Sequence, residues 1–158
     1  MTITHINNYF DSADRHKILV IQTDTASKID CLSELKSLEI PVVNIGLELA
    51  KYLDTIDDYS FLEIEAIDFC KKLLEKQKTR VKNAEIPLLA IYNLGIMSEP
   101  RLAIKITSLI KEFSKTTGLI IVWEHEILNA HTLSWKPENP AFSIDLSKTA
   151  FKQIKYEI

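Results

Sequence analysis

Residues 17–31, which read KILVIQTDTASKIDC, carry the clearest structural pattern in the sequence. Residues 18–21 form a continuous apolar run, which is typical of a strand buried on both faces of a parallel sheet. A short polar turn over residues 22–25 follows the run. Apolar side chains then recur at helical spacing, at Ala26, Ile29, Leu32 and Leu35. The stretch therefore predicts a buried strand, a tight turn and a helix that carries a lysine in its first turn.

This order of elements matches the layout of a nucleotide-binding P-loop, G-x-x-x-x-G-K-[ST], whose backbone N–H groups cradle phosphates. The eight positions of the motif fall on residues 22–29, and only Lys28 matches. Gln22 and Ser27 replace the two glycines, and their side chains fill space that phosphates need. Ile29 replaces the Ser/Thr whose hydroxyl binds Mg²⁺. The sequence predicts the P-loop layout without most of its chemistry, so we do not expect ATP hydrolysis.

If a phosphate site is retained, it consists of Thr25, Ala26, Ser27 and Lys28. A helix N-terminus attracts anions, so weak ATP or ADP binding stays open, and no other cofactor is expected. Against binding, Asp24 places a carboxylate beside the expected phosphates. The alternative is a plain strand–turn–helix in which Thr25 or Asp24 caps the helix. The sequence leaves open whether Lys28 meets an anion or pairs with Asp24.

Length and composition indicate an ordinary globular domain. The chain has 158 residues, of which 46% are hydrophobic and 26% charged. We expect residues 1–16 to form an N-terminal arm or short helix and residues 17–158 to form one domain. The net charge of −3 argues against a generic nucleic-acid coating protein. Cys31 and Cys70 lie far apart, and no run is apolar enough for a membrane span or a signal core, so we expect a cytoplasmic protein.

The rest of the chain alternates strands and helices. Further strands are predicted at 40–44, 87–93 and 119–123, with shorter ones at 131–135 and 141–145; the tail, 146–158, is ambiguous between helix and strand. Helices are predicted at 45–56, from Ser60 to about Gln77, and after Ser98. This alternation predicts an α/β, three-layer, P-loop NTPase-like domain with a mostly parallel sheet of about five strands.

Local signals place the helix ends. Residues 60–63 read S-F-L-E, a capping box that opens a helix whose apolar side is formed by Phe61, Ile64, Ile67 and Leu74. Ser98 is the expected N-cap of the last helix, with Pro100 in its first turn. Gly118 suits the C′ position of that helix.

With these elements in order, the chain resembles the small P-loop subunit (BrxF) of bacteriophage-exclusion (BREX) defence systems over roughly residues 14–145. The resemblance rests on HKILVIQ at 16–22 and on IPVVNIGLELAKYL at 40–53, similar to P-x-(I/V)-N-(I/V)-x-LELS-x-x-L. It extends to YNLGIMSEP at 92–100, similar to a DNIELLF-DP stretch, and to VWEHEILNAHTLSWKPENPAF at 122–142.

The resemblance implies a subunit of an antiphage complex. Its partners would include a large ATPase, a methyltransferase and a phosphatase-like protein, and self-association is a further option. This chain departs from the family at the Walker B position, where Tyr92 stands for an Asp and Gly95 for the following Glu. We therefore expect a non-catalytic subunit that acts through protein–protein contacts.

Two other groups of residues are candidate sites. Glu124, His125 and Glu126, with His131, follow the strand at 119–123; they suggest a metal or general-base site, against which solvated loop residues are the simpler interpretation. Glu124 could also stand at the phosphate-sensor position, with the wrong charge for that role.

The second group is a basic run, made up of Lys71, Lys72, Lys76, Lys78, Arg80 and Lys82. Such a run either contacts nucleic acid or an acidic partner, or simply places cations at a helix C-terminus. Residues 48–68 contain seven acids against Lys51 alone, and opposed acidic and basic faces favour docking to a partner. The alternative function is a regulator that binds nucleotide or nucleic acid through Lys28 and residues 71–82 without hydrolysis; direct nucleic-acid contact is left open.

Overall fold

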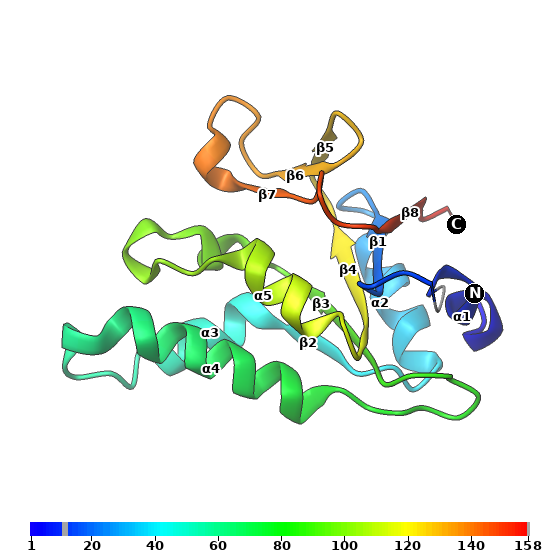
Figure 1. Ribbon diagram of the computed structural model, residues 1–158, viewed down its shortest axis with the longest axis horizontal. Helices are drawn as coiled ribbons and strands as arrows, with labels where there is room; N and C mark the ends of the chain where they lie inside the picture. Colours follow the sequence, from blue (N-terminus) through cyan, green and yellow to red (C-terminus); the bar gives the residue numbers. More distant parts are fainter. Residues whose placement is uncertain (11–12, 158) are drawn as a thin grey trace.

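The central feature of the computed structural model, which describes residues 1–10 and 13–157, is a five-stranded sheet (Figure 1). The strand order is β2-β3-β4-β1-β8, and every neighbouring pair is parallel. Its strands are β1 (Ile18–Gln22), β2 (Val42–Asn44), β3 (Leu88–Tyr92), β4 (Gly118–Trp123) and β8 (Lys152–Lys155). The predicted α/β class and mostly parallel sheet of about five strands are confirmed.

Helices cover both faces of this sheet. The short helices α1 (Ile3–Tyr9) and α2 (Lys28–Ser37) pack on one face, and α3 (Ile45–Leu53), α4 (Leu62–Gln77) and α5 (Ile106–Phe113) pack on the other. Side chains alternate between the two faces along each strand. In β1, Ile18 and Val20 join the core under α3, α4 and α5, whereas Leu19 and Ile21 join the core under α1 and α2.

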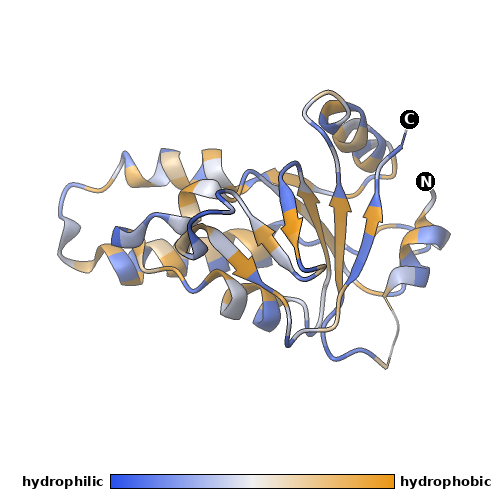
Figure 2. Cartoon of the chain, turned by 90° about the horizontal axis from the view of Figure 1, so that it is seen from above, coloured by the Kyte–Doolittle hydropathy of each residue, from blue (hydrophilic) through white to orange (hydrophobic). Residues whose placement is uncertain are grey.

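The continuous apolar runs form the buried strands because a parallel sheet covered on both faces has no solvent side. All six residues of β4 are buried, as are the first four of β1 and of β3. Several strands are accordingly orange over much of their length in Figure 2. The N-terminal segment takes part in this core, because Ile6 and Phe10 are buried against the α2 face. Asp11 and Ser12, part of the expected arm, lie outside the described residues.

A second, small sheet lies between β4 and β8 in the chain. Its strands β5 (Glu126–Leu128), β6 (Thr132–Ser134) and β7 (Ser143–Asp145) pair antiparallel. Leu133 and Ile144 from this sheet are buried in the core on the α5 face. The ambiguous tail resolves into β8, which adds to the edge of the main sheet beside β1.

The predicted capping box at residues 60–63 is wrong. The carboxylate of Asp58 accepts hydrogen bonds from the Ser60 backbone N–H at 2.9 Å and from its hydroxyl at 2.6 Å. A 3-10 turn, η1 (Tyr59–Phe61), therefore precedes α4, which begins at Leu62. Phe61 and Ile64, expected on the buried side of the helix, are 62% and 67% exposed.

The start predicted for the last helix is also wrong. Residues 95–102 form two 3-10 turns, η2 (Gly95–Ser98) and η3 (Pro100–Leu102), and the Ser98 hydroxyl donates to the Gly95 carbonyl instead of capping a helix. Ala103, at φ 50°, interrupts the helical path, so α5 begins only at Ile106.

Gly118 does not end α5 as a C′ residue, because it is the first residue of β4. A Cβ there would lie 2.7 Å from Leu88 Cδ2 and 2.8 Å from Phe10 Cε2, so close packing accounts for the glycine. Within the described part of the chain, no helix combines the length and apolar character needed to cross a membrane.

Candidate functional site at the carboxyl edge of the sheet

The topology places a switch point, where the chain leaves two neighbouring strands in opposite directions, at the carboxyl ends of β1 and β4. From β1 the chain passes through α2, on one face, to β2 at the far edge, whereas from β4 it passes over the other face to β8. In open α/β sheets, ligands bind where connections diverge in this way. The turn after β1 and the end of β4 meet here, and the Thr23 N–H donates to the Trp123 carbonyl at 2.8 Å.

The turn after β1 is held by its own carboxylate. One oxygen of Asp24 accepts from the Ser27 backbone N–H at 2.7 Å and from the Ser27 hydroxyl at 2.8 Å. These hydrogen bonds hold the pKa of Asp24 below its ordinary value. Ser27 directly precedes α2 and makes no side-chain capping bond of its own. The capping bond comes from Asp24, whose carboxylate accepts from the N–H three residues further on, so of the two predicted caps it is Asp24 that makes the bond. Ala26, expected inside the helix, is exposed in the turn.

Lys28 pairs with the end of β4. Its ammonium lies 2.9 Å from Glu124 Oε1, and the two side chains are only 25% and 22% exposed. The ammonium also lies 6.0 Å from the centre of the Tyr92 ring, at the limit of a cation–π contact. The partner of Lys28 is thus Glu124, from a strand about one hundred residues away, and not the neighbouring Asp24.

Two groups that a bound phosphate would use are therefore already engaged. The Ser27 N–H binds Asp24, and the Lys28 ammonium binds Glu124. An anion entering this turn would have to displace one carboxylate and approach the other. Thr25 remains exposed beside them, so the predicted residues are together in space but closed by acidic partners from this chain.

Beside the end of β4, the ends of β2 and β3 carry the amides Asn44 and Asn93 and the ring of Tyr92. Asn93, with φ of 59°, donates from Nδ2 to Asn44 Oδ1 at 2.8 Å, and the same oxygen caps α3 by accepting from the Leu47 N–H at 3.0 Å. A Cβ on Gly46 would meet the Asn93 carbonyl oxygen, so only glycine fits this contact. Tyr92, which carries the ring, is the last residue of β3.

Little open space remains at the edge. A cavity of about 90 Å³ lies between residues 93–95 and the end of β4, and Trp135 closes it. This is well below the roughly 300–1,000 Å³ of typical small-molecule sites. Trp123 is buried beneath the cavity, and its Nε1 donates to the Glu126 carbonyl at 3.0 Å. Its ring packs edge-on against the Trp135 ring, with 4.9 Å between the ring centres.

The cluster proposed around Glu124 separates in space. His125 packs edge-on against Trp123 at 5.5 Å, Glu126 is exposed in β5, and His131 Nδ1 lies 3.0 Å from the Thr132 hydroxyl. Among residues 1–10 and 13–157, no group of three or more His, Cys, Asp or Glu is arranged to hold a metal ion. Glu124 instead forms the ion pair with Lys28.

The basic run lies on the last turns of α4 and the strand-like segment after it. Lys71, Lys76, Arg80 and Lys82 are exposed. Lys72 bonds to Asp68 at 2.8 Å and Lys78 to Glu75 at 2.6 Å. The run thus continues to the amino end of β3, where Thr79 pairs with Leu88, whereas Lys28 follows the carboxyl end of β1.

Sequence reasoning missed two features of this molecule. It placed Lys28 and Glu124 at strand ends but could not pair them, because that requires the strand order in which β4 lies beside β1. It also missed the hollow between α3, η2 and η3, since apolar periodicity predicts neither the 3-10 turns η2 and η3 nor the elements that they contact. No protein-family model matches this chain, and neither does any curated protein.

Proposed function

We propose that this chain is a non-catalytic, P-loop-like subunit that acts through protein–protein contacts in a bacterial antiphage defence complex. The observation that carries the proposal is the 2.9 Å pair between Lys28 and Glu124, which binds the one retained P-loop lysine inside the chain. The partners proposed are the large ATPase, methyltransferase or phosphatase-like subunits of such a system.

The residues around the pair support this proposal. Hydrolysis of a nucleoside triphosphate needs a metal held by a hydroxyl and a carboxylate, together with a positioned water. Ile29 and Tyr92 stand at the two metal-holding positions, and neither has a carboxylate or an aliphatic hydroxyl. Ile29 is 69% exposed and points away from the core.

The alternative of a nucleic-acid-binding regulator has less support, because Lys72 and Lys78 already bind carboxylates of their own helix. It makes a distinct prediction, namely DNA or RNA binding that weakens steeply with salt. A chain that acts through protein contacts would bind nucleic acid only weakly at 0.15 M salt.

The test is ATP turnover by rigorously purified protein with Mg²⁺, compared among the wild type, Lys28→Ala and Lys36→Ala. Lys36 is the matched control because it is an exposed lysine on the same helix. We expect no turnover above that of a buffer blank in any of the three. Turnover that Lys28→Ala abolishes and Lys36→Ala retains would refute the proposal.

A further inference from the structure

Three large apolar side chains are exposed at the tip of the hairpin formed by α3 and α4. Tyr59, Phe61 and Ile64 are 63%, 62% and 67% exposed, and they lie within six residues, on η1 and the first turn of α4. The hairpin extends away from the central sheet (Figures 1 and 2). Single exposed apolar residues are common, but a group of three this exposed is typical of an interaction site.

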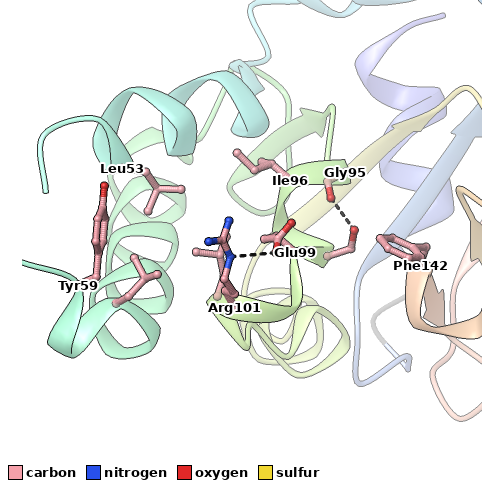
Figure 3. A pocket seen from close by; sticks show the side chains of 10 residues that line it. Leu53, Tyr59, Gly95, Ile96, Glu99, Arg101 and Phe142 are labelled. Carbon is pink, nitrogen blue, oxygen red and sulfur yellow. Dashed lines mark hydrogen bonds and ion pairs between the residues drawn. The ribbon is translucent and has the colours of Figure 1, made fainter.

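An apolar groove of about 570 Å³ adjoins these side chains. Leu53 and Leu62 line it from the hairpin, Ile96 and Leu102 from η2 and η3, and Phe142 from η4 (Pro140–Phe142). Figure 3 shows the two walls, with Leu53 and Tyr59 on one side and Ile96 opposite. The groove has the volume of a site that takes several side chains.

The groove and the three exposed side chains form one continuous surface, which we call the tip surface. Tyr59 lines the groove, and with Arg101 it also lines the shallow hollow that contains Phe61 and Ile64. A partner seated on the tip surface could therefore bury exposed aromatic rings and fill a preformed pocket together. This combination is typical of the energetic centre of an interface.

The segment that carries the tip surface is acidic. Residues 53–65 contain five acids and no lysine or arginine; Asp54, Asp57, Asp58 and Glu63 are exposed, whereas Glu65 has one buried carboxylate oxygen. Asp58 is kept ionised because hydrogen bonds from the Ser60 hydroxyl and N–H lower its pKa. The cation of the groove lining, Arg101, has its Nε 3.4 Å from Glu99 Oε1. A partner therefore meets apolar surface bordered by negative charge.

We propose that the tip surface docks a basic amphipathic helix of a partner protein. This inference rests on the proposed function and gives it a surface and a partner chemistry. Apolar side chains at helical spacing fill the groove, and flanking Lys or Arg side chains meet the acids at 53–65. The charge selects the partner, and the buried apolar side chains supply most of the affinity.

A second copy of this chain does not fit the tip surface as well. Its basic run at 71–82 supplies the charge, but the leucines of that run face the core of its own domain. Leu74 is 2% exposed, and Leu73 packs against the same core. The run therefore offers no exposed apolar side chain to fill the groove.

The test is selection of a displayed library of random peptides about 15 residues long, roughly four helical turns. The library is selected on the full chain and counter-selected on Tyr59→Ser/Ile64→Ser. Enriched peptides are then titrated by fluorescence anisotropy against the wild type, the double variant, Asp57→Asn/Glu63→Gln and Ile29→Ser. Ile29 is the matched control because it is 69% exposed but lies on α2.

We expect enriched peptides to be net positive, with apolar residues at helical spacing. Their affinity should fall at least tenfold in Tyr59→Ser/Ile64→Ser and about threefold in Asp57→Asn/Glu63→Gln, and it should not change in Ile29→Ser. Several outcomes would overturn the proposal: no peptide lost on the double variant, enrichment of acidic peptides, or self-association of the wild type that the double variant abolishes. ATP turnover is a separate readout, so the proposed function can fail while peptide docking stands.

Discussion

The carboxyl edge of the sheet and the tip surface differ in what they leave unsatisfied. At the edge, Asp24 and Glu124 bind the donors that face them, and the remaining cavity is about 90 Å³. At the tip, large apolar side chains remain exposed beside a groove of about 570 Å³. Burial of apolar area yields about 25 cal/mol per Å², so the tip retains binding free energy that the edge has already used internally. The two regions thus differ in how much apolar surface each leaves open to another molecule.

The largest effect is expected beneath the edge. Replacing Trp123 with Ala should lower the free energy of unfolding by about 3–5 kcal/mol, because a fully buried indole leaves a cavity. Trp123 is 2% exposed, and it packs against the rings of His125 and Trp135. Urea unfolding followed by far-UV circular dichroism measures the change.

Trp135→Ala is the control for this variant, because the same ring type is only partly buried there. We expect it to cost clearly less than Trp123→Ala. Equal losses for the two tryptophans, or a loss below about 1 kcal/mol for Trp123, would contradict the account of a filled edge.

A second set of internal polar contacts joins α2 to both ends of the described chain. Glu34 accepts a hydrogen bond from the Met1 amine at 2.6 Å and one from the Tyr156 hydroxyl at 2.8 Å. The hydrogen bond from the amine, followed by that from Tyr156, lowers the pKa of Glu34, and Glu34 raises the pKa of Tyr156 to about 12. Glu34→Gln should cost about 1.5–3 kcal/mol at pH 7, the range for hydrogen bonds to a charged group.

The cost of Glu34→Gln should depend on pH. Since the folded pKa of Glu34 lies below its ordinary value of 4.5, this carboxylate stabilises the fold above pH 4.5 and stops doing so as the pH falls through the folded pKa. The urea midpoints of wild type and variant should therefore converge in acid, and a constant gap would argue against the pairing. Tyr156→Phe, which removes one of the two bonds, should cost less.

Breaking the pair between Lys28 and Glu124 should have a smaller effect, which is measured as a change in affinity for an anion. Glu124→Gln removes the charge that holds Lys28 and should tighten ADP or inorganic phosphate binding about fivefold, which corresponds to roughly 1 kcal/mol for a partly exposed pair. Isothermal titration of wild type and variant measures the difference. Glu126→Gln, two residues further along the chain, should leave the affinity unchanged. Similar anion affinities in all three proteins would mean that Glu124 does not close the site.

The sequence predicted the buried elements well because their signals are local. The apolar runs at 18–21 and 119–123 need cover on both faces, and only a parallel sheet between helices provides it. β8 escaped prediction, since Lys152 to Lys155 contain only one apolar residue and form a strand through pairing with β1. Strand order also could not be predicted, so the contact between Lys28 and Glu124 remained hidden.

The tip surface was mispredicted for a related reason. Helical periodicity identifies apolar residues on a common face, but it does not show whether another element covers that face. The predicted face of the helix at 60–77 is buried at Leu74, where the core lies, and exposed at Phe61 and Ile64, beyond the end of the sheet. The apolar pattern continues where the packing stops, and this mismatch points to an intermolecular contact.

The smallest effect on stability is expected at the tip. Phe61→Ser and Ile64→Ser should each change the free energy of unfolding by no more than about 0.5 kcal/mol, because most of each side chain stays in water in the folded protein. Urea unfolding of each variant beside Leu74→Ala gives the comparison within one helix. Leu74 is 2% exposed, and truncating it should cost about 2–5 kcal/mol.

The outcome of that comparison decides how the exposed side chains should be understood. If Phe61→Ser or Ile64→Ser lowers the free energy of unfolding as much as Leu74→Ala does, the replaced side chain is buried in solution and belongs to the core. If both are neutral, the apolar character of this turn contributes nothing to folding. The proposal that these side chains contact another molecule then rests on the peptide selection, which measures such contacts directly.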